Sequence, residues 1–215
     1  MKTILVTAFE PFGGETLNSS WEAVRPLQGC QIAEANIEVC QLPCVFDTSL
    51  KHLYATIEHV KPEIVIAVGE AGNRSNISVE RVAININDAR IPDNAGKQPV
   101  DTPVIIGGPT AYFATLPIKA IVDELKRVGI PAKVSQTAGT FVCNHVMYGL
   151  LHYLTQHAPA VRSGFIHVPY LPEQATKYSD APSMAVEMIT VALKIAIESA
   201  LRNENDIAIA GGTTN

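Results

Sequence analysis

The chain has 215 residues, of which 47% are hydrophobic and 17% are charged. Its 16 Lys and Arg residues and 21 Asp and Glu residues give a formal net charge of −5 at pH 7. This composition supplies a sizeable apolar core, which excludes a disordered chain, and the length favours one domain. Because the charge balance is acidic and no run of Lys or Arg occurs, we expect no binding to nucleic acid or to an anionic membrane.

The longest stretch without Asp, Glu, Lys or Arg runs from Val134 to Val161. It contains three histidines and several other polar residues, so it does not fit a membrane-spanning helix. The apolar run at the start breaks at Glu10, too early for a secretory signal. The four cysteines include no CxxC pair. These features predict a cytoplasmic protein with reduced thiols and no structural zinc.

Strand-like apolar runs and helical patterns alternate along the chain. In chain order we expect a strand at 3–9, a helix capped by Asn18–Ser20, a strand at 37–42, a helix from Asp47, a strand at 63–69, a helix from Pro117 to Gly129, a strand at 131–136, a helix at Cys143, a strand at 164–168, and a last helix from about Ser183 with Met184, Met188, Val191 and Ile195 on one stripe. This alternation predicts an α/β fold with a mostly parallel sheet and helices on both faces.

One region departs from the alternation. From Glu70 to Pro117 the pattern indicates no helix, only an alternating stretch at 77–86, and so long an excursion is commonly functional. The polar, Gly-rich tail at 203–215 is expected to be flexible. In an open α/β fold, ligands bind beyond the carboxyl ends of the strands, which is where we look for chemistry.

Cys143 is the candidate nucleophile. It lies in AGTFVCNHVMYGLL (138–151), where an apolar run turns into a helix. A thiol in the first helical turn is expected to have a lowered pKa, and free backbone N–H groups there can hold an oxyanion. The alternative is that Cys143 is a small buried hydrophobe, as free cysteines usually are.

His167 is the candidate base. It stands in GFIHVPY (164–170), near the end of the strand that follows the Cys143 helix. A right-handed β-α-β connection would bring it to the same sheet edge as Cys143, whereas His145 does not face Cys143 on a helix. A Cys–His pair for nucleophilic catalysis follows, with an ordinary core histidine as the alternative.

The sequence signals for other functional sites are less specific. The spacing does not choose an acidic third member from the irregular region, where Glu80, Asp88, Asp93 and Asp101 all stand. The glycines of FGG (12–14) and GEAG (69–72) follow strands, but no GxGxxG or GxxxxGK[ST] motif occurs. A binding module that holds a nucleoside or phosphate at GEAG therefore stays open as a different class of function. No HExxH motif occurs, and we expect neither a metal nor a cofactor.

Several segments together resemble the pyrrolidone carboxyl peptidase (pyroglutamyl peptidase I) family, in order from residue 1 to about 200. They are VTAFEPFGGETLNSSWEAV (6–24), SVERVAININDARIPDN (78–94), TAGTFVCNHVMYGLL (137–151) and GFIHVPYLPEQ (164–174). The resemblance implies a cytosolic cysteine peptidase that removes N-terminal pyroglutamate from peptides through a thioacyl-enzyme. It also implies a three-layer α/β/α sandwich, one peptidase domain over 1–215 and a homotetramer.

The resemblance also assigns site residues. It places the nucleophile on Cys143, the base on His167 and the acidic third member on Glu80. Arg90 would assist the backbone N–H groups at the oxyanion. The pocket for the neutral lactam maps onto Phe9, Phe12, Asn18, Ile91, Phe141 and Val142. One departure is Ala8, where the family usually has Gly. Another hydrolase, acting on a different amide or thioester with the same Cys–His pair, is the remaining alternative.

Overall fold

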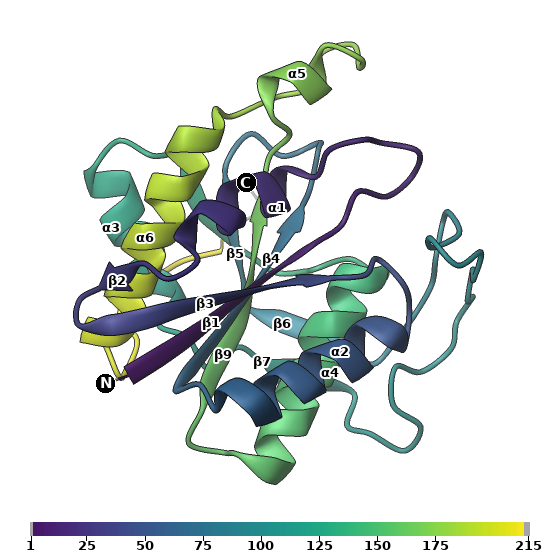
Figure 1. Ribbon diagram of the computed structural model, residues 1–215, viewed down its shortest axis with the longest axis horizontal. Helices are drawn as coiled ribbons and strands as arrows, with labels where there is room; N and C mark the ends of the chain where they lie inside the picture. Colours follow the sequence, from purple (N-terminus) through teal and green to yellow (C-terminus); the bar gives the residue numbers. More distant parts are fainter. Residues whose placement is uncertain (1, 213–215) are drawn as a thin grey trace.

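The computed structural model describes residues 2–212, and its centre is a seven-stranded sheet (Figure 1). Across the sheet the strands are β2 (Gln31–Ile32), β3 (Ala35–Leu42), β1 (Lys2–Phe9), β4 (Ile64–Glu70), β9 (Arg162–Val168), β5 (Ile77–Glu80) and β8 (Ala132–Ser135). All of the strands predicted from apolar runs are present, and β4 is buried along its whole length. A continuous apolar run suits such a strand, because both of its faces are covered.

Four neighbouring strands in the middle of the sheet, β3, β1, β4 and β9, run parallel to one another. Their carboxyl ends therefore meet at one edge of the sheet, at Leu42, Phe9, Glu70 and Val168. The remaining strands make the sheet mixed, because β2 is antiparallel to β3 and β5 is antiparallel to β9. The prediction of a mostly parallel sheet is confirmed.

The connection through α4 (Val142–His157) differs from the expected β-α-β unit. β8 precedes α4 and β9 follows it, but β5 lies between these two strands. Since β5 is antiparallel to β9 and parallel to β8, β8 and β9 run in opposite directions. The right-handed parallel crossover is therefore wrong: the alternating stretch at 77–86 supplies a strand that separates the two.

Helices cover both faces of the sheet, which confirms the three-layer α/β/α sandwich (Figure 1). The even-numbered side chains of β1, such as Ile4 and Val6, pack in a core with α1 (Ser19–Val24), α3 (Ile118–Arg127) and α6 (Val186–Arg202). The odd-numbered ones, such as Leu5 and Phe9, pack with α2 (Thr48–Val60) and α4. Ala8 belongs to the first core, on the opposite face of the sheet from α4.

The predicted stripe of the last helix is buried only in part: Met184 is buried and Ile195 packs against the core, but the other two residues are exposed. α6 begins at Val186, and Met188 and Val191 are 43% and 48% exposed. Its buried face combines larger aliphatic residues (Ile189, Leu193 and Ile197) with small ones (Ala192, Ala196, Ser199 and Ala200). Alanines let α6 pack closely against α3 and α1, so contact with these neighbours, rather than side-chain size alone, decides which face is buried.

The excursion between residues 70 and 117 is described throughout and contains no helix. It forms β5, a two-stranded sheet of β6 (Val82–Ile84) and β7 (Ala111–Phe113), and long loops that project from the body of the molecule (Figure 1). The remaining elements are the 3-10 turn η1 (Arg25–Leu27) and the short α5 (Pro172–Ala175). Within residues 2–212, no helix is long and apolar enough to cross a membrane.

The described part of the C-terminal tail is held by hydrogen bonds. Asp206 Oδ1 accepts from the backbone N–H groups of Lys119 and Ala120, both at 3.0 Å, and so caps α3 from outside the helix. Arg81 Nη2 donates to the carbonyl of Gly211 at 3.0 Å. The tail predicted to be flexible thus has fixed partners up to this point, and residues 213–215 lie outside the described residues.

Candidate active site

His167 and Glu80 come together through the antiparallel pairing of β9 and β5. His167 is opposite Ser78 in the register, so Glu80, two residues further on, is its diagonal neighbour on the same face. His167 Nδ1 lies 2.8 Å from Glu80 Oε1, and both side chains are buried. Because a carboxylate only accepts, Nδ1 carries the proton and donates it, which leaves the Nε2 lone pair available as a base.

Cys143 reaches the same place because Gly69 has no side chain. Gly69 is the register partner of His167 between β4 and β9. A Cβ built on Gly69 would lie 2.9 Å from Cys143 Sγ and 2.7 Å from Phe165 Cζ. The thiol and the Phe165 ring therefore fill the space above Gly69, one strand away from His167. This is the carboxyl end of β4, the edge of the sheet at which the fold predicts a site.

The Cys143 thiol differs from the expected thiolate. Burial, together with the negative charges of Glu80 and Glu70, raises its pKa to about 12, although Arg74 acts in the opposite direction. The expectation that the start of α4 lowers the pKa is therefore wrong in direction, because desolvation and two carboxylates outweigh the helix dipole. At neutral pH the group is a thiol, so a base must remove its proton when it attacks.

The electrostatics of His167 and Glu80 suit that base. Burial lowers the pKa of His167, and the hydrogen bond and charge of Glu80 offset only part of this effect. Burial would raise the pKa of Glu80, but the hydrogen bond from His167, the charge of His167 when acid protonates it, and the positive charge of Arg74 hold it below the ordinary value. At neutral pH the pair is therefore a neutral imidazole beside an ionised carboxylate.

The other acidic candidates are placed elsewhere. Asp88 and Asp101 are exposed. Asp93 is buried, but its carboxylate accepts from the backbone N–H groups of Phe46, Ala95 and Lys97 and so holds its own loop together. Of the four acids left open by spacing, Glu80 is the one in contact with His167.

Several residues assigned to the lactam pocket gather in one apolar cluster. The ring centroids of Phe12 and Phe141 are 6.2 Å apart, and Phe46, which the sequence analysis missed, packs edge-on to Phe141 at 5.4 Å. Ile91 Cδ1 would lie 3.9 Å from a Cβ built on Gly13, so it sits against the loop that carries Phe12.

Two further apolar pocket residues are fixed by the core beneath this cluster. Phe9 is buried at the end of β1, with its ring centroid 6.3 Å from that of Phe165. Val142 is fully buried in the first turn of α4. Together with the Phe12–Phe141 cluster, they surround the start of α4 with apolar groups.

The two polar residues assigned to substrate binding have different surroundings. Asn18 is the N-cap of α1, because its Oδ1 accepts from Ser20 N at 3.0 Å, and its Nδ2 donates to the carbonyl of Glu10 at 3.0 Å. Asn18 thus holds the loop that carries Phe12. Arg90 is exposed, and its carbonyl accepts from Gln98 Nε2 at 3.1 Å.

Two charged residues that the sequence analysis did not select lie close to the triad. The Glu70 carboxylate accepts from Ser19 N at 2.7 Å and from Gln174 Nε2 at 2.8 Å, at the carboxyl end of β4. Arg74 forms an ion pair with Glu80. Both belong to the segment that directly follows the apolar run of β4. This position at the edge of the sheet is the sequence feature from which they could have been predicted.

The GEAG segment does not form a phosphate cradle. The space above Gly69 is filled by Cys143 and Phe165, and a Cβ on Gly72 would overlap the Tyr170 ring, 1.9 Å from its Cζ. The carboxylate of Glu70, between these glycines, would repel an anion. The glycines therefore admit neighbouring side chains of the protein.

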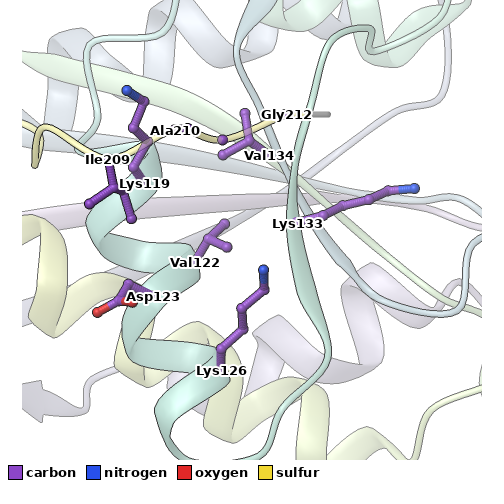
Figure 2. A pocket seen from close by; sticks show the side chains of 10 residues that line it. Lys119, Val122, Asp123, Lys126, Lys133, Val134, Ile209, Ala210 and Gly212 are labelled. Carbon is purple, nitrogen blue, oxygen red and sulfur yellow. The ribbon is translucent and has the colours of Figure 1, made fainter. Parts of the chain in front are cut away.

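A separate hollow of about 190 Å³ lies between α3, β8 and the C-terminal tail (Figure 2). It is lined by Lys119, Val122, Asp123, Lys126, Lys133, Val134, Ile209, Ala210, Gly211 and Gly212. None of the candidate site residues lines it, and its three ammonium groups do not converge in Figure 2. Within residues 2–212, no group of three His, Cys, Asp or Glu residues is placed to hold a metal ion.

A family model and the similar proteins of known name all indicate the same family. The model of the pyroglutamyl peptidase family matches residues 2–203. Pyrrolidone-carboxylate peptidase 1 of Photorhabdus laumondii is 64% identical over 220 residues, covering 100% of both chains. The pyrrolidone-carboxylate peptidase of Brevibacillus brevis is 58% identical over 212 residues, covering 99% of each chain.

Solved structures agree with this similarity. The crystal structure of pyroglutamyl peptidase I from Bacillus amyloliquefaciens matches with a TM-score of 0.94 and 53% identity, over 96% of this chain and 100% of that chain. The pyrrolidone carboxyl peptidase from Thermococcus litoralis matches with a TM-score of 0.94 and 41% identity, over 98% of this chain and 100% of that chain.

Proposed function

The chain belongs to the pyroglutamyl peptidase family, and from this premise we propose that Cys143, His167 and Glu80 are its catalytic residues. The enzyme is a cysteine peptidase that removes N-terminal pyroglutamate from peptides. The observation that supports the assignment is the hydrogen bond of 2.8 Å between His167 Nδ1 and Glu80 Oε1, beside a thiol that fills the space above Gly69.

The first half of the reaction is acyl transfer to the thiol. As Cys143 Sγ attacks the carbonyl carbon of pyroglutamate, its proton passes to His167 Nε2. Glu80 keeps the Nδ1 proton in place and stabilises the imidazolium that forms. The tetrahedral intermediate then collapses, the C–N bond breaks, and His167 gives its proton to the leaving amine. A thioester of Cys143 remains.

The second half returns the free enzyme. His167 Nε2, neutral again, takes a proton from a water molecule that attacks the thioester carbonyl. When the C–S bond breaks, that proton passes to Cys143, and pyroglutamate leaves as the free acid. In both halves the oxyanion is held by backbone N–H groups in the first turn of α4, which lack acceptors within the helix, with Arg90 assisting.

The apolar cluster forms the specificity pocket. Pyroglutamate is a flat, neutral lactam without a free amine, and we assign its binding to Phe9, Phe12, Asn18, Ile91, Phe141 and Val142. A pocket of this kind rejects a peptide with a free N-terminal Glu or Gln, because it offers no partner to a buried ammonium group.

The assembly and location follow as further parts of the proposal. We infer one peptidase domain over residues 1–215, since both cores pack against one sheet. A homotetramer would cover large apolar side chains on the excursion, where Ile106 is 92% exposed and Phe113 is 70% exposed. The four free cysteines suit the reducing cytoplasm.

Hydrolysis of a fluorogenic pyroglutamyl amide tests the assignment, with a prolyl amide as the substrate control. Wild type should hydrolyse only the lactam substrate, and Cys143→Ser should lose activity by at least about 10³-fold. Cys30→Ser, a change at a cysteine outside the site, should keep wild-type activity. Full activity of Cys143→Ser would refute the proposed nucleophile, and hydrolysis of a different amide alone would refute the pocket.

A further inference from the structure

A row of polar side chains crosses β9, β5 and β8, the three strands next to β4, above which the thiol lies. Glu80 on β5 is the register partner of Ser135 on β8, and on its other side it contacts His167 on β9. All three residues are buried. A buried, ionised carboxylate in the middle of this row is costly unless donors or cations surround it.

Arg74 supplies the cation. Its Nη1 lies 2.5 Å from Glu80 Oε1 and 3.4 Å from Ser135 Oγ. Its Nη2 donates to the carbonyl of Thr137 at 2.9 Å. Thr137 lies in the loop that leads to Cys143, so one planar guanidinium contacts both the acid of the proposed triad and the main chain that precedes the proposed nucleophile.

The two oxygens of Glu80 are used unequally. Oε1 accepts from both His167 Nδ1 and Arg74 Nη1, whereas the buried Oε2 has no hydrogen-bond partner among the described residues. The direction of the carboxylate therefore depends chiefly on the two donors that share Oε1, with the Ser135 hydroxyl as a weaker neighbour. Without Arg74, the carboxyl group could rotate while still accepting from His167.

We propose that Arg74 is a positioning residue of the reaction, which orients Glu80 toward His167 and fixes the main chain before Cys143. The inference rests on the proposed function, because it requires Glu80 and His167 to act as a pair. It also assigns a charge effect to Arg74, since a cation beside Glu80 weakens the pull of the carboxylate on the imidazolium. The imidazole is thereby kept neutral and ready to accept a proton.

The test compares the pH dependence of kcat and kcat/KM for the pyroglutamyl amide in wild type and three variants. Arg74→Gln should lower kcat by about 10- to 100-fold with KM changed less than about threefold, as expected for lost support of a catalytic group. Its acid limb should move to higher pH, because His167 becomes more basic without the neighbouring cation. Arg74→Lys keeps the positive charge but loses the planar guanidinium with its two donor nitrogens. The acid limb of its pH profile should therefore match wild type, while kcat stays reduced.

Arg81→Gln is the matched control. Arg81 is the next residue after Glu80, but it binds the tail at Gly211, so this change should leave both the acid limb and kcat at wild-type values. A folded Arg74→Gln with wild-type kcat and an unmoved acid limb would overturn the inference. If Arg74→Gln does not fold, Arg74→Lys decides: reduced kcat supports the inference, and wild-type kcat overturns it.

Glu80→Gln, measured alongside, separates this inference from the proposed function. Wild-type kcat in Glu80→Gln would mean that the catalytic set itself is wrong. Loss of activity in Glu80→Gln together with full activity in Arg74→Gln would support the proposed triad and refute only the role of Arg74.

Discussion

At Cys143, the surroundings decide the protonation state more strongly than the helix does. The first turn of α4 favours a thiolate, but desolvation of the thiol and the nearby charges of Glu80 and Glu70 together raise its pKa to about 12. His167 has a lowered pKa and is neutral at pH 7. In the proposed mechanism the two residues therefore act as a thiol and a general base, and the ion pair forms only during attack.

This protonation state predicts the pH dependence of the reaction. Only neutral His167 accepts the proton, and its pKa lies below the ordinary 6.5. The acid limb of kcat/KM should therefore lie below pH 6.5, followed by a plateau into alkaline pH while Cys143 remains a thiol. The ultraviolet absorbance of thiolate, taken as wild type minus Cys143→Ser, should be absent at pH 7. A thiolate signal at pH 7 would show a preformed ion pair instead.

Gly69 is predicted to be essential for the position of the nucleophile. In Gly69→Ala, the added methyl would lie 2.9 Å from Cys143 Sγ and 2.7 Å from Phe165 Cζ, so the thiol or the ring must move. We expect kcat to fall at least about 10-fold, with about 1–3 kcal/mol of stability lost to overpacking. Gly211→Ala is the control, because its methyl makes only an ordinary contact with Val134 at 3.5 Å. Wild-type kcat in Gly69→Ala would contradict this account.

At the scale of elements, α4 joins two loops through a second buried histidine. His145 Nε2 accepts from the backbone N–H of Asp47, and its Nδ1 donates to Asn87 Oδ1, both at 3.0 Å. One loop leads into α2, and the other belongs to the excursion that carries Ile91. Burial lowers the pKa of His145 to about 4, so this link holds only while the ring is neutral.

His145 should therefore make folding sensitive to acid. Its pKa falls from 6.5 to about 4 on folding, so the stabilisation is complete above pH 6.5 and is lost as the pH falls toward 4. The loss amounts to about 3 kcal/mol. Free energies of unfolding in urea at pH 7 and pH 4 should differ by about that much more in wild type than in His145→Gln, which keeps a donor and an acceptor without titrating. An equal pH dependence in the two proteins would contradict the assignment.

Local sequence patterns predicted the helices and strands better than they predicted which elements pair or pack together. The apolar runs placed β1, β4 and β9, and the range Asn18–Ser20 was expected to cap a helix, whose N-cap is Asn18. The direction of β5 was not predictable, because alternation at 77–86 shows a strand but not which strand pairs with it. The buried face of α6 was missed for a similar reason, since it depends on the close approach of neighbouring helices.

For the candidate site too, local sequence patterns identified single residues but not their tertiary contacts. Cys143 and His167 were selected from their positions at the ends of elements, and the resemblance to a family chose Glu80 from four acids. Arg74 has no local signature: its role depends on contacts with β5 and with the loop after β8, which only the folded sheet brings together.

At the scale of the whole molecule, the excursion combines two tasks. It contributes Glu80 and Ile91 to the site, and it also exposes Ile106 and Phe113 at 92% and 70%. Large apolar side chains exposed to this degree are typical of a surface that another subunit covers. The proposed tetramer would therefore be built by the segment that also completes the site.

The oligomeric state tests this arrangement. Sedimentation equilibrium of wild type should give four times the chain mass, and the double change Ile106→Glu with Phe113→Glu should give a smaller species. Burying two unpaired carboxylates at an interface is costly, which is the reason for the expected dissociation. Glu34→Lys is the control for a charge change at an exposed position outside the excursion and should leave the mass unchanged. A monomeric wild type would contradict the proposal.

The most direct measurement for the central claim is mass spectrometry of the enzyme quenched with acid during turnover of a pyroglutamyl peptide. The account predicts one added pyroglutamyl group, carried as a thioester on the fragment that contains Cys143 and removed by hydroxylamine. The same adduct should be absent in Cys143→Ser treated identically. An acyl group on any other residue, in an enzyme that releases pyroglutamate at the normal rate, would contradict the account.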